Sequence, residues 1–189
     1  MMHLFFDTET TGFARTAPLD HPSQPRLVQF AGILAKDKLP IRRCSFLVHP
    51  EHVIIPQSAT EIHGITTERA RAEGIPLPIA VAIWQGLVSL ADVIVGHNIK
   101  FDLKIMEIAE AQAKMQSQAI KKQTICTMAE ATNIVKLPGG KSKNSFKFPK
   151  LEECIKFFFN ESLDGAHDAL VDTEACMRVY YEILKRKAA

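Results

Sequence analysis

Residues 2–12 read Met-His-Leu-Phe-Phe-Asp-Thr-Glu-Thr-Thr-Gly, and this stretch sets the expected start of the fold. The phenylalanine-rich run from Met2 to Thr8 predicts a strand, and Thr10-Thr11-Gly12 predicts the turn that ends it. Residues two apart in a strand project from the same face, so Asp7 and Glu9 place two carboxylates side by side. These charges repel each other, and a divalent cation would relieve the repulsion. An isolated Asp-x-Glu is more often a solvated pair at a turn.

Two later segments place further acids at the starts of predicted helices. Asp102 follows the apolar strand 92–95 by a few residues and opens a helix, whose N-terminus stabilises a carboxylate. Near the end of the chain, Asp168 opens another helix, and Asp172 falls one turn beyond it.

These acids are suited to a pair of hard cations. Mg²⁺ prefers oxygen ligands, and two such ions about 4 Å apart can hold the attacking and leaving oxygens of a phosphoryl displacement. A nearby histidine can accept a proton from the attacking water at neutral pH. Four acids could form the set: Asp7, Glu9, Asp102 and Asp172.

The rest of the chain alternates predicted strands and helices. Strands are expected at 2–8, 27–35, 43–49, 92–95 and 124–127, and helices at 58–63, 66–72, 78–90, 101–115, 128–135, 151–158 and 168–187. Ser58 and Glu61 match a capping box, and Gly64 is expected to end that helix. We expect residues 1–189 to form one α/β domain. Its mixed central sheet would begin as an antiparallel meander, continue with parallel strands and be flanked by helices.

Composition excludes several classes of protein. Hydrophobic residues make up 47% of the 189 residues and charged residues 23%, which is typical of a folded domain and not of a disordered or membrane-spanning chain. The N-terminus lacks the basic region of a signal peptide. Four well-separated cysteines without a Cys-x-x-Cys pair argue against a zinc ribbon and favour a reducing, cytoplasmic location.

The net charge of +2 predicts no strongly basic face, yet lysines gather in one segment. Residues 136–150 contain five lysines, Lys136, Lys141, Lys143, Lys147 and Lys150. A solvated loop and a phosphate-contacting loop are equally favoured.

Three segments occur in a familiar order: Asp7-Thr8-Glu9-Thr10-Thr11-Gly12, His97-Asn98-Ile99-Lys100-Phe101-Asp102 and His167-Asp168-Ala169-Leu170-Val171-Asp172. Together they resemble the three motifs of the DEDDh, or DnaQ-like, 3′–5′ exonuclease superfamily, and specifically the epsilon-subunit exonuclease domain of DNA polymerase III. The resemblance spans nearly the whole chain, and three motifs in order are far more specific than one. It implies an RNase H-like fold.

The resemblance also implies roles for individual residues. Catalytic residues would be Asp7, Glu9, Asp102, His167 and Asp172, with the four acids holding two Mg²⁺ or Mn²⁺ ions and His167 acting as general base. The implied substrate-binding residues are Thr10, Gly12, His63 and Asn98. For His63, the end of a helix is an equally favoured explanation.

The function implied by the resemblance is hydrolysis of terminal phosphodiesters of DNA, or of RNA, to release 5′-mononucleotides. An oligoribonuclease or RNase T-like RNA exonuclease, a catalytically weak nucleic-acid-binding adaptor and a hydrolase of free nucleotides are alternatives. The expected partner is a single-stranded nucleic-acid 3′ end, with no membrane. Polymerase-bound relatives carry a C-terminal extension, whereas this chain stops at Ala189 after its last predicted helix, which argues against a polymerase partner.

Overall fold

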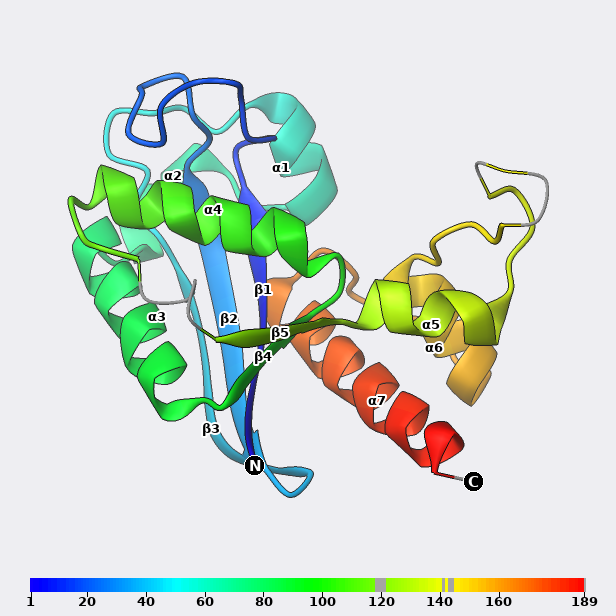
Figure 1. The fold of residues 1–189 in the computed structure, drawn as a ribbon. Coiled ribbons are helices and arrows are strands. Elements are labelled where there is room, and N and C mark those ends of the chain that lie inside the picture. The colour runs from blue at the N-terminus through cyan, green and yellow to red at the C-terminus, as the bar shows by residue number, and fades with distance from the viewer. Residues whose placement is uncertain (118–121, 141, 143–144, 189) are drawn as a thin grey trace.

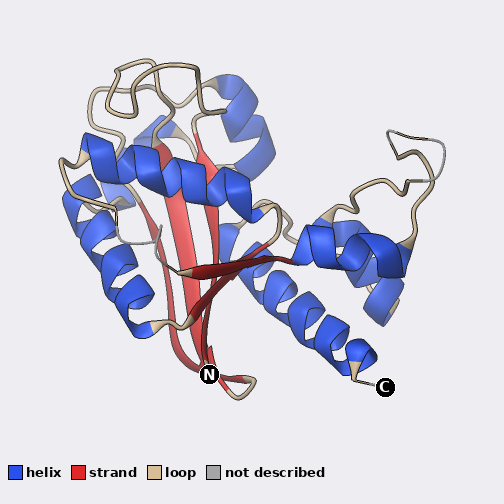
Figure 2. Ribbon diagram, viewed as in Figure 1, coloured by secondary structure: helices blue, strands red, loops and turns tan. Residues whose placement is uncertain are grey.

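The computed structural model describes residues 1–117, 122–140, 142 and 145–188. Within these residues the chain forms one five-stranded sheet flanked by helices on both faces (Figures 1 and 2). The strands lie in the order β3-β2-β1-β4-β5. Their bounds are β1 Met2–Thr10, β2 Leu27–Lys36, β3 Leu39–Leu47, β4 Val93–Gly96 and β5 Gln123–Cys126.

The predicted fold class is confirmed by the strand directions. β1 pairs with β2, and β2 with β3, in antiparallel orientation, whereas β4 runs parallel to both β1 and β5. The prediction for β3 was wrong in its bounds, because Asp37 and Lys38 alone form the turn. Both have positive φ, 50° and 71°, as a two-residue hairpin turn requires. The strand therefore begins four residues earlier than predicted.

The helices form two layers and an end cluster. Helices α3 and α4 cover one face of the sheet, and α7 covers the other with α5 and α6 packed against it; α1 and α2 lie at one end. Their bounds are α1 Gln57–His63, α2 Thr67–Glu73, α3 Leu77–Leu90, α4 Ile99–Gln112, α5 Thr127–Val135, α6 Leu151–Phe159 and α7 Ala169–Lys187.

Helix α6 begins where predicted, α4 begins two residues earlier, and the other five helices begin within one residue of the predicted positions. The capping box at Ser58 is absent because α1 begins directly after Pro56, and Glu61 accepts a hydrogen bond from the Gln57 side chain at 3.2 Å instead. Helix α4 begins at Ile99 and not at 101, because Asn98 adopts a left-handed conformation (φ 64°) that turns the chain out of β4. Gly64 ends α1 as predicted, with φ 71°.

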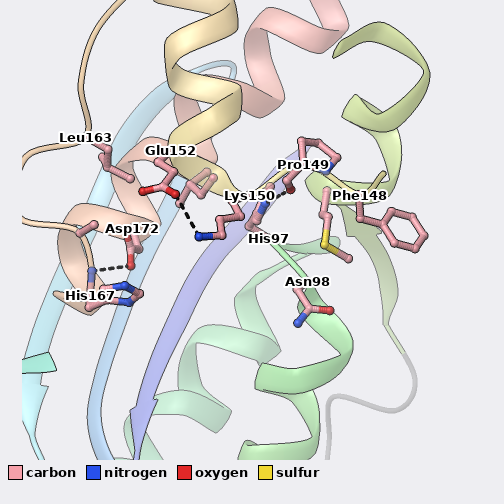
Figure 3. Close-up of a pocket in the computed structure, with 12 residues that line it drawn as sticks. His97, Asn98, Phe148, Pro149, Lys150, Glu152, Leu163, His167 and Asp172 are labelled. Carbon is pink, nitrogen blue, oxygen red and sulfur yellow. Dashed lines mark hydrogen bonds and ion pairs between the residues drawn. The ribbon is translucent and has the colours of Figure 1, made fainter. Parts of the chain in front are cut away.

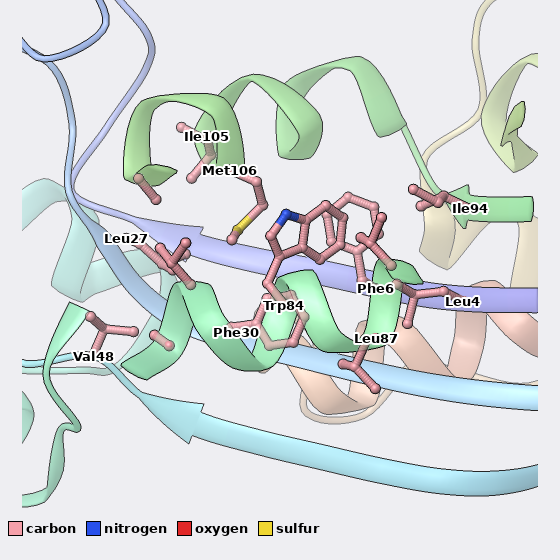
Figure 4. Packing of buried hydrophobic residues seen from close by; sticks show 14 of the residues in the cluster. Leu4, Phe6, Leu27, Phe30, Val48, Trp84, Leu87, Ile94, Ile105 and Met106 are labelled. Atoms are coloured by element: carbon pink, nitrogen blue, oxygen red, sulfur yellow. The ribbon is translucent and has the colours of Figure 1, made fainter. Parts of the chain in front are cut away.

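Strand β1 is buried on both faces, which fixes its position in the molecule. On one face, Phe6 packs against Trp84 of α3 with ring centroids 4.7 Å apart, and Phe30 of β2 completes this aromatic cluster (Figure 4). On the other face, Phe5 packs against Tyr180 of α7. The last residues of β1 are therefore held by a core that cannot shift without loss of packing.

Among the described residues, no helix combines the length and the apolar character needed to cross a bilayer.

The packing of Trp84 generates a prediction about stability. Trp84 is fully buried, and its indole Nε1 donates to Glu110 Oε1 at 3.2 Å. We expect Trp84→Phe to lower the free energy of unfolding by about 1–3 kcal/mol, because a cavity forms and a buried carboxylate loses a donor. Urea unfolding followed by circular dichroism measures this change. Leu90→Ala, on the exposed end of the same helix, should change it by less than about 0.5 kcal/mol.

Candidate active site

Asp7 and Glu9 lie near the C-terminal end of β1, on the face that α7 covers. They share the side of the strand that Phe5 uses to reach α7, since alternate residues project from one face. Glu9 is 9% exposed. The two carboxylates are thus carried by a strand that is packed on both faces.

Asp102 reaches the same place from the other face, in the first turn of α4. It is 3% exposed, and its Oδ1 accepts hydrogen bonds from Thr8 Oγ1 at 2.7 Å and from Thr8 N at 3.2 Å. Strands β1 and β4 are adjacent and parallel, so their C-terminal ends meet where α4 begins. This topology brings residues 94 positions apart into contact.

Asp172 is brought to the site by the way α7 docks on the sheet. Gln29 of β2, which pairs with Glu9 across the sheet, accepts a hydrogen bond from Ala169 N at 3.2 Å and donates to Asp168 Oδ2 at 3.1 Å. Asp168 also caps α7, because its other oxygen accepts bonds from the first turn of the helix. Gln29 therefore fixes the start of α7 beside the two acids of β1.

His167 precedes this cap in a left-handed conformation, with φ 69°. Its backbone N–H donates to Asp172 Oδ2 at 3.0 Å, and its side chain is exposed. Ligand atoms of Glu9, His167 and Asp172 lie within 4.8 Å of one another. The imidazole is thus next to the carboxylates and open to solvent.

A cavity of about 290 Å³ brings these residues together. It is lined by Asp7, Thr8, Glu9, His97, Asn98, Phe101, Asp102, Leu151, His167 and Asp172. All five residues predicted to be catalytic are among them, and so is Asn98. The structure therefore unites side chains from three distant motifs in one cavity.

The carboxyl groups in this cavity have raised pKa values, because they are crowded together and shielded from water. Burial, and then the neighbouring carboxylates of Asp172 and Asp102, raise the pKa of Glu9 to about 8. Burial raises the pKa of Asp102 to about 7, although the hydrogen bonds from Thr8 oppose that rise. Burial, followed by the charges of Asp102 and Asp172, also raises the pKa of Asp7, and burial raises that of Asp172.

This arrangement fits divalent cations. Four acids with raised pKa values must be neutralised either by protons or by positive charge, and their donor atoms are oxygens, which hard cations prefer. His167 lies at the rim of the cavity, beside the acids. Among the hydrogen bonds of the described residues, none joins its ring to these acids. Such a cavity can bind a cation pair and place a base next to it.

The other predicted substrate-binding residues lie beside this cavity and do not line it. Thr10 Oγ1 donates to Gly12 O at 2.6 Å and accepts from Gly12 N at 3.0 Å, so the hydroxyl closes the turn after β1. His63 Nδ1 accepts from Ile65 N at 3.0 Å. Burial lowers the pKa of His63, the nearby Thr10 carbonyl raises it, and the charge of His167 lowers it. His63 is therefore close to the site.

Of the described residues in the lysine-rich segment 136–150, those at its C-terminal end lie beside the site. Lys147 and Lys150 form ion pairs with Glu153 and Glu152 at 2.7 and 3.2 Å, and Lys136 ends α5, whereas Lys141 and Lys143 lie outside the described residues. His97 Nε2 donates to Pro149 O at 3.0 Å, which ties this end of the segment to the end of β4 (Figure 3). Burial lowers the pKa of His97 to about 4, so this link is made by a neutral ring.

Sequence reasoning missed three residues that shape the site. Thr8 orients Asp102, Gln29 docks α7, and Phe101 forms an apolar wall of the cavity. Gln29 left a signal, because it is a polar residue within the apolar strand Leu27–Lys36. Thr8 and Phe101 left none beyond their neighbours in the motifs.

Solved structures show the same fold at low sequence identity. The zinc-bound complex of E. coli ExoI with single-stranded DNA matches with a TM-score of 0.78 and 24% identity, over 99% of this chain and 41% of that one. E. coli exonuclease I with a dT13 oligonucleotide gives 0.75 and 23%, over 97% and 41%. Exonuclease I with the inhibitor BCBP gives 0.75 and 21%, over 99% and 42%. The chain thus spans about two fifths of these proteins, and the predicted RNase H-like exonuclease fold is confirmed.

Sequence comparison gives the family. No curated protein matches the chain. The family model described as Exonuclease, of the RNase T type, matches residues 4–180, a range that contains all three motifs and every residue of the cavity. The match confirms the predicted superfamily, while the resemblance to the epsilon subunit in particular stays a prediction. By this match over nearly its whole length, the chain belongs to the exonuclease family.

Proposed function

We propose that residues 1–189 act as one 3′–5′ exonuclease domain that releases 5′-mononucleotides from single-stranded nucleic acid with two Mg²⁺ or Mn²⁺ ions. The observation that carries the proposal is the convergence of Asp7, Glu9, Asp102, His167 and Asp172 in one cavity. A binding adaptor would gain nothing from four acids that repel one another, so their retention favours catalysis.

Each residue has a role that its position supports. Asp7, Glu9 and Asp172 would hold one cation, and Asp7 with Asp102 the second. The bound cations would stabilise the attacking and leaving oxygens. His167 would accept the proton of the attacking water, since its imidazole is exposed beside Glu9 and Asp172.

The substrate is proposed to be single-stranded DNA, with RNA as the alternative. Phe101 offers an apolar wall for a terminal sugar or base beside the acids. The related complexes contain single-stranded DNA or oligonucleotides, which supports this choice. All four cysteines are free thiols, which fits the proposed cytoplasmic location.

The reaction is tested with strands labelled at the 5′ end. We expect a ladder that shortens by one nucleotide at a time in Mg²⁺ or Mn²⁺ and does not form in EDTA, on DNA more rapidly than on RNA. Asp7→Asn should lower kcat/KM by at least about 100-fold, because it removes a charge that holds the cations. Asp20→Asn, at an exposed turn, is the matched control and should retain full activity. Undiminished turnover by Asp7→Asn would reject the proposed site.

The raised pKa values predict how stability depends on pH. Glu9 and Asp102 have folded pKa values of about 8 and about 7, well above those of unfolded acids, so the folded state binds protons more tightly. The stability that these protons provide is present at low pH and lost as the pH rises through the folded pKa values.

In EDTA, the Tm should therefore fall between about pH 6.5 and 8.5, a range in which His97 is already neutral. Mg²⁺ or Mn²⁺ should raise the Tm more at the upper pH than at the lower. Asp7→Asn should flatten the fall. A metal-free Tm that rises over this range would contradict the electrostatic description of the cavity.

Thr8 is predicted to act as a positioning residue for Asp102. We expect Thr8→Val to raise the cation concentration for half-maximal activity by about 10-fold, since the carboxylate loses a short hydrogen bond. The pH profile of activity should also shift to higher pH, because that bond holds down the pKa of Asp102. Thr132→Val, which removes a hydroxyl bonded only within α5, is the control and should change neither quantity.

A further inference from the structure

The cavity that holds the acids does not end at His167. A second cavity of about 320 Å³ shares five lining residues with it, namely His97, Asn98, Leu151, His167 and Asp172. A larger groove of about 820 Å³ along the free edge of β5 shares Asn98, Met128 and Phe148 with that second cavity. The three hollows therefore adjoin one another and form a track that leads away from the acids.

Phe148 lies where the second cavity meets the groove. It lines both, and the residue is 57% exposed. In Figure 3 the ring lies across the pocket from Asp172 and points outward. An exposed aromatic ring beside the cavity offers a flat apolar face on which a nucleobase can stack.

The neighbours of Phe148 hold it in place. Pro149 O accepts the bond from His97, and Lys147 is fixed both by its N–H bond to Leu137 O at 2.9 Å and by its ion pair with Glu153. The exposed ring is thus presented by anchored backbone on both sides. An aromatic ring carried by anchored backbone is suited to stacking, because the backbone loses little conformational entropy when a ligand binds.

The charge along the groove favours an anion. Lys100 lines it, is exposed, and takes part in none of the ion pairs formed among the described residues. Lys187, at the far side, is paired with Glu130. The groove therefore combines a stacking surface with net positive charge, which is how proteins bind single-stranded nucleic acid without reading its sequence.

We propose that Phe148 is a base-stacking platform, and Lys100 a phosphate contact, for the nucleotides upstream of the 3′ end that occupies the acidic cavity. The proposal rests on the proposed exonuclease function and specifies its substrate as a single strand of several nucleotides. A duplex keeps its bases stacked inside, so it would gain nothing from this ring.

The test compares two substrates in Mg²⁺ or Mn²⁺: a dodecanucleotide, which reaches the groove, and a dinucleotide, which has no bases to place there. The quantity measured is the ratio of kcat/KM for the dodecanucleotide to kcat/KM for the dinucleotide. Phe148→Ala should lower this ratio about 5- to 100-fold, the loss expected for one stacked base. Phe148→Trp should keep the ratio, because it preserves an aromatic face.

Phe157→Ala is the matched control. Phe157 is 45% exposed on α6, lines none of the three hollows, and should leave the ratio unchanged. Lys100→Gln should reduce the dependence of log KM on log salt by about 0.7 for the dodecanucleotide.

The outcomes separate the two proposals. A wild-type protein that hydrolyses both substrates, together with a Phe148→Ala variant of unchanged ratio, would overturn the platform and leave the exonuclease intact. A wild-type protein that hydrolyses neither substrate would overturn both. An unchanged ratio with an altered sedimentation mass in Phe148→Ala would overturn the platform and assign the groove to contacts between copies of the chain.

Discussion

The crowding of four carboxylates in one cavity requires the surrounding structure to hold them against their mutual repulsion. Asp7, Glu9, Asp102 and Asp172 are gathered where burial raises the pKa of every one of them and the charges of neighbouring acids raise it further. The protein opposes this repulsion with packing, since β1 is enclosed by aromatic side chains on both faces. Cation binding would relieve the repulsion among these carboxylates. Metal binding is therefore coupled to the stability of the folded protein.

Two polar residues of the sheet, Thr8 and Gln29, position the helices that carry the other acids. Thr8 projects from the opposite face of β1 to Asp7 and Glu9, and it holds Asp102 on α4. Gln29 holds the start of α7 from the neighbouring strand. One short run of sheet thus sets the positions of both helices that complete the cavity. These contacts fix Asp102 and the start of α7 next to the two acids of β1, so the like charges are held close together.

The acidic cavity and the groove proposed to bind the substrate strand lie in different parts of the fold. The acids lie at the meeting of β1, α4 and α7, whereas the track that leaves them runs along α5, α6 and the free edge of β5. His97 belongs to both regions, because it lines the acidic cavity and bonds to Pro149 beside Phe148. Its neutral ring, with a pKa of about 4, keeps this link unchanged over the pH range in which the acids titrate.

The amino-acid sequence correctly predicted the fold class, the order of strands and helices, the family and the five residues that meet in the acidic cavity. It could do so because strand periodicity and motif order are local properties that the chain carries wherever it folds. It placed the ends of β3, α1 and α4 inaccurately, since the turns at Asp37-Lys38, Pro56 and Asn98 are decided by backbone conformation. The folded structure was needed to find the contacts of Thr8 and Gln29 and the exposed position of Phe148. Their partners are distant in the chain, and a hydrogen bond or an exposed ring acquires meaning only when the fold brings its neighbours together.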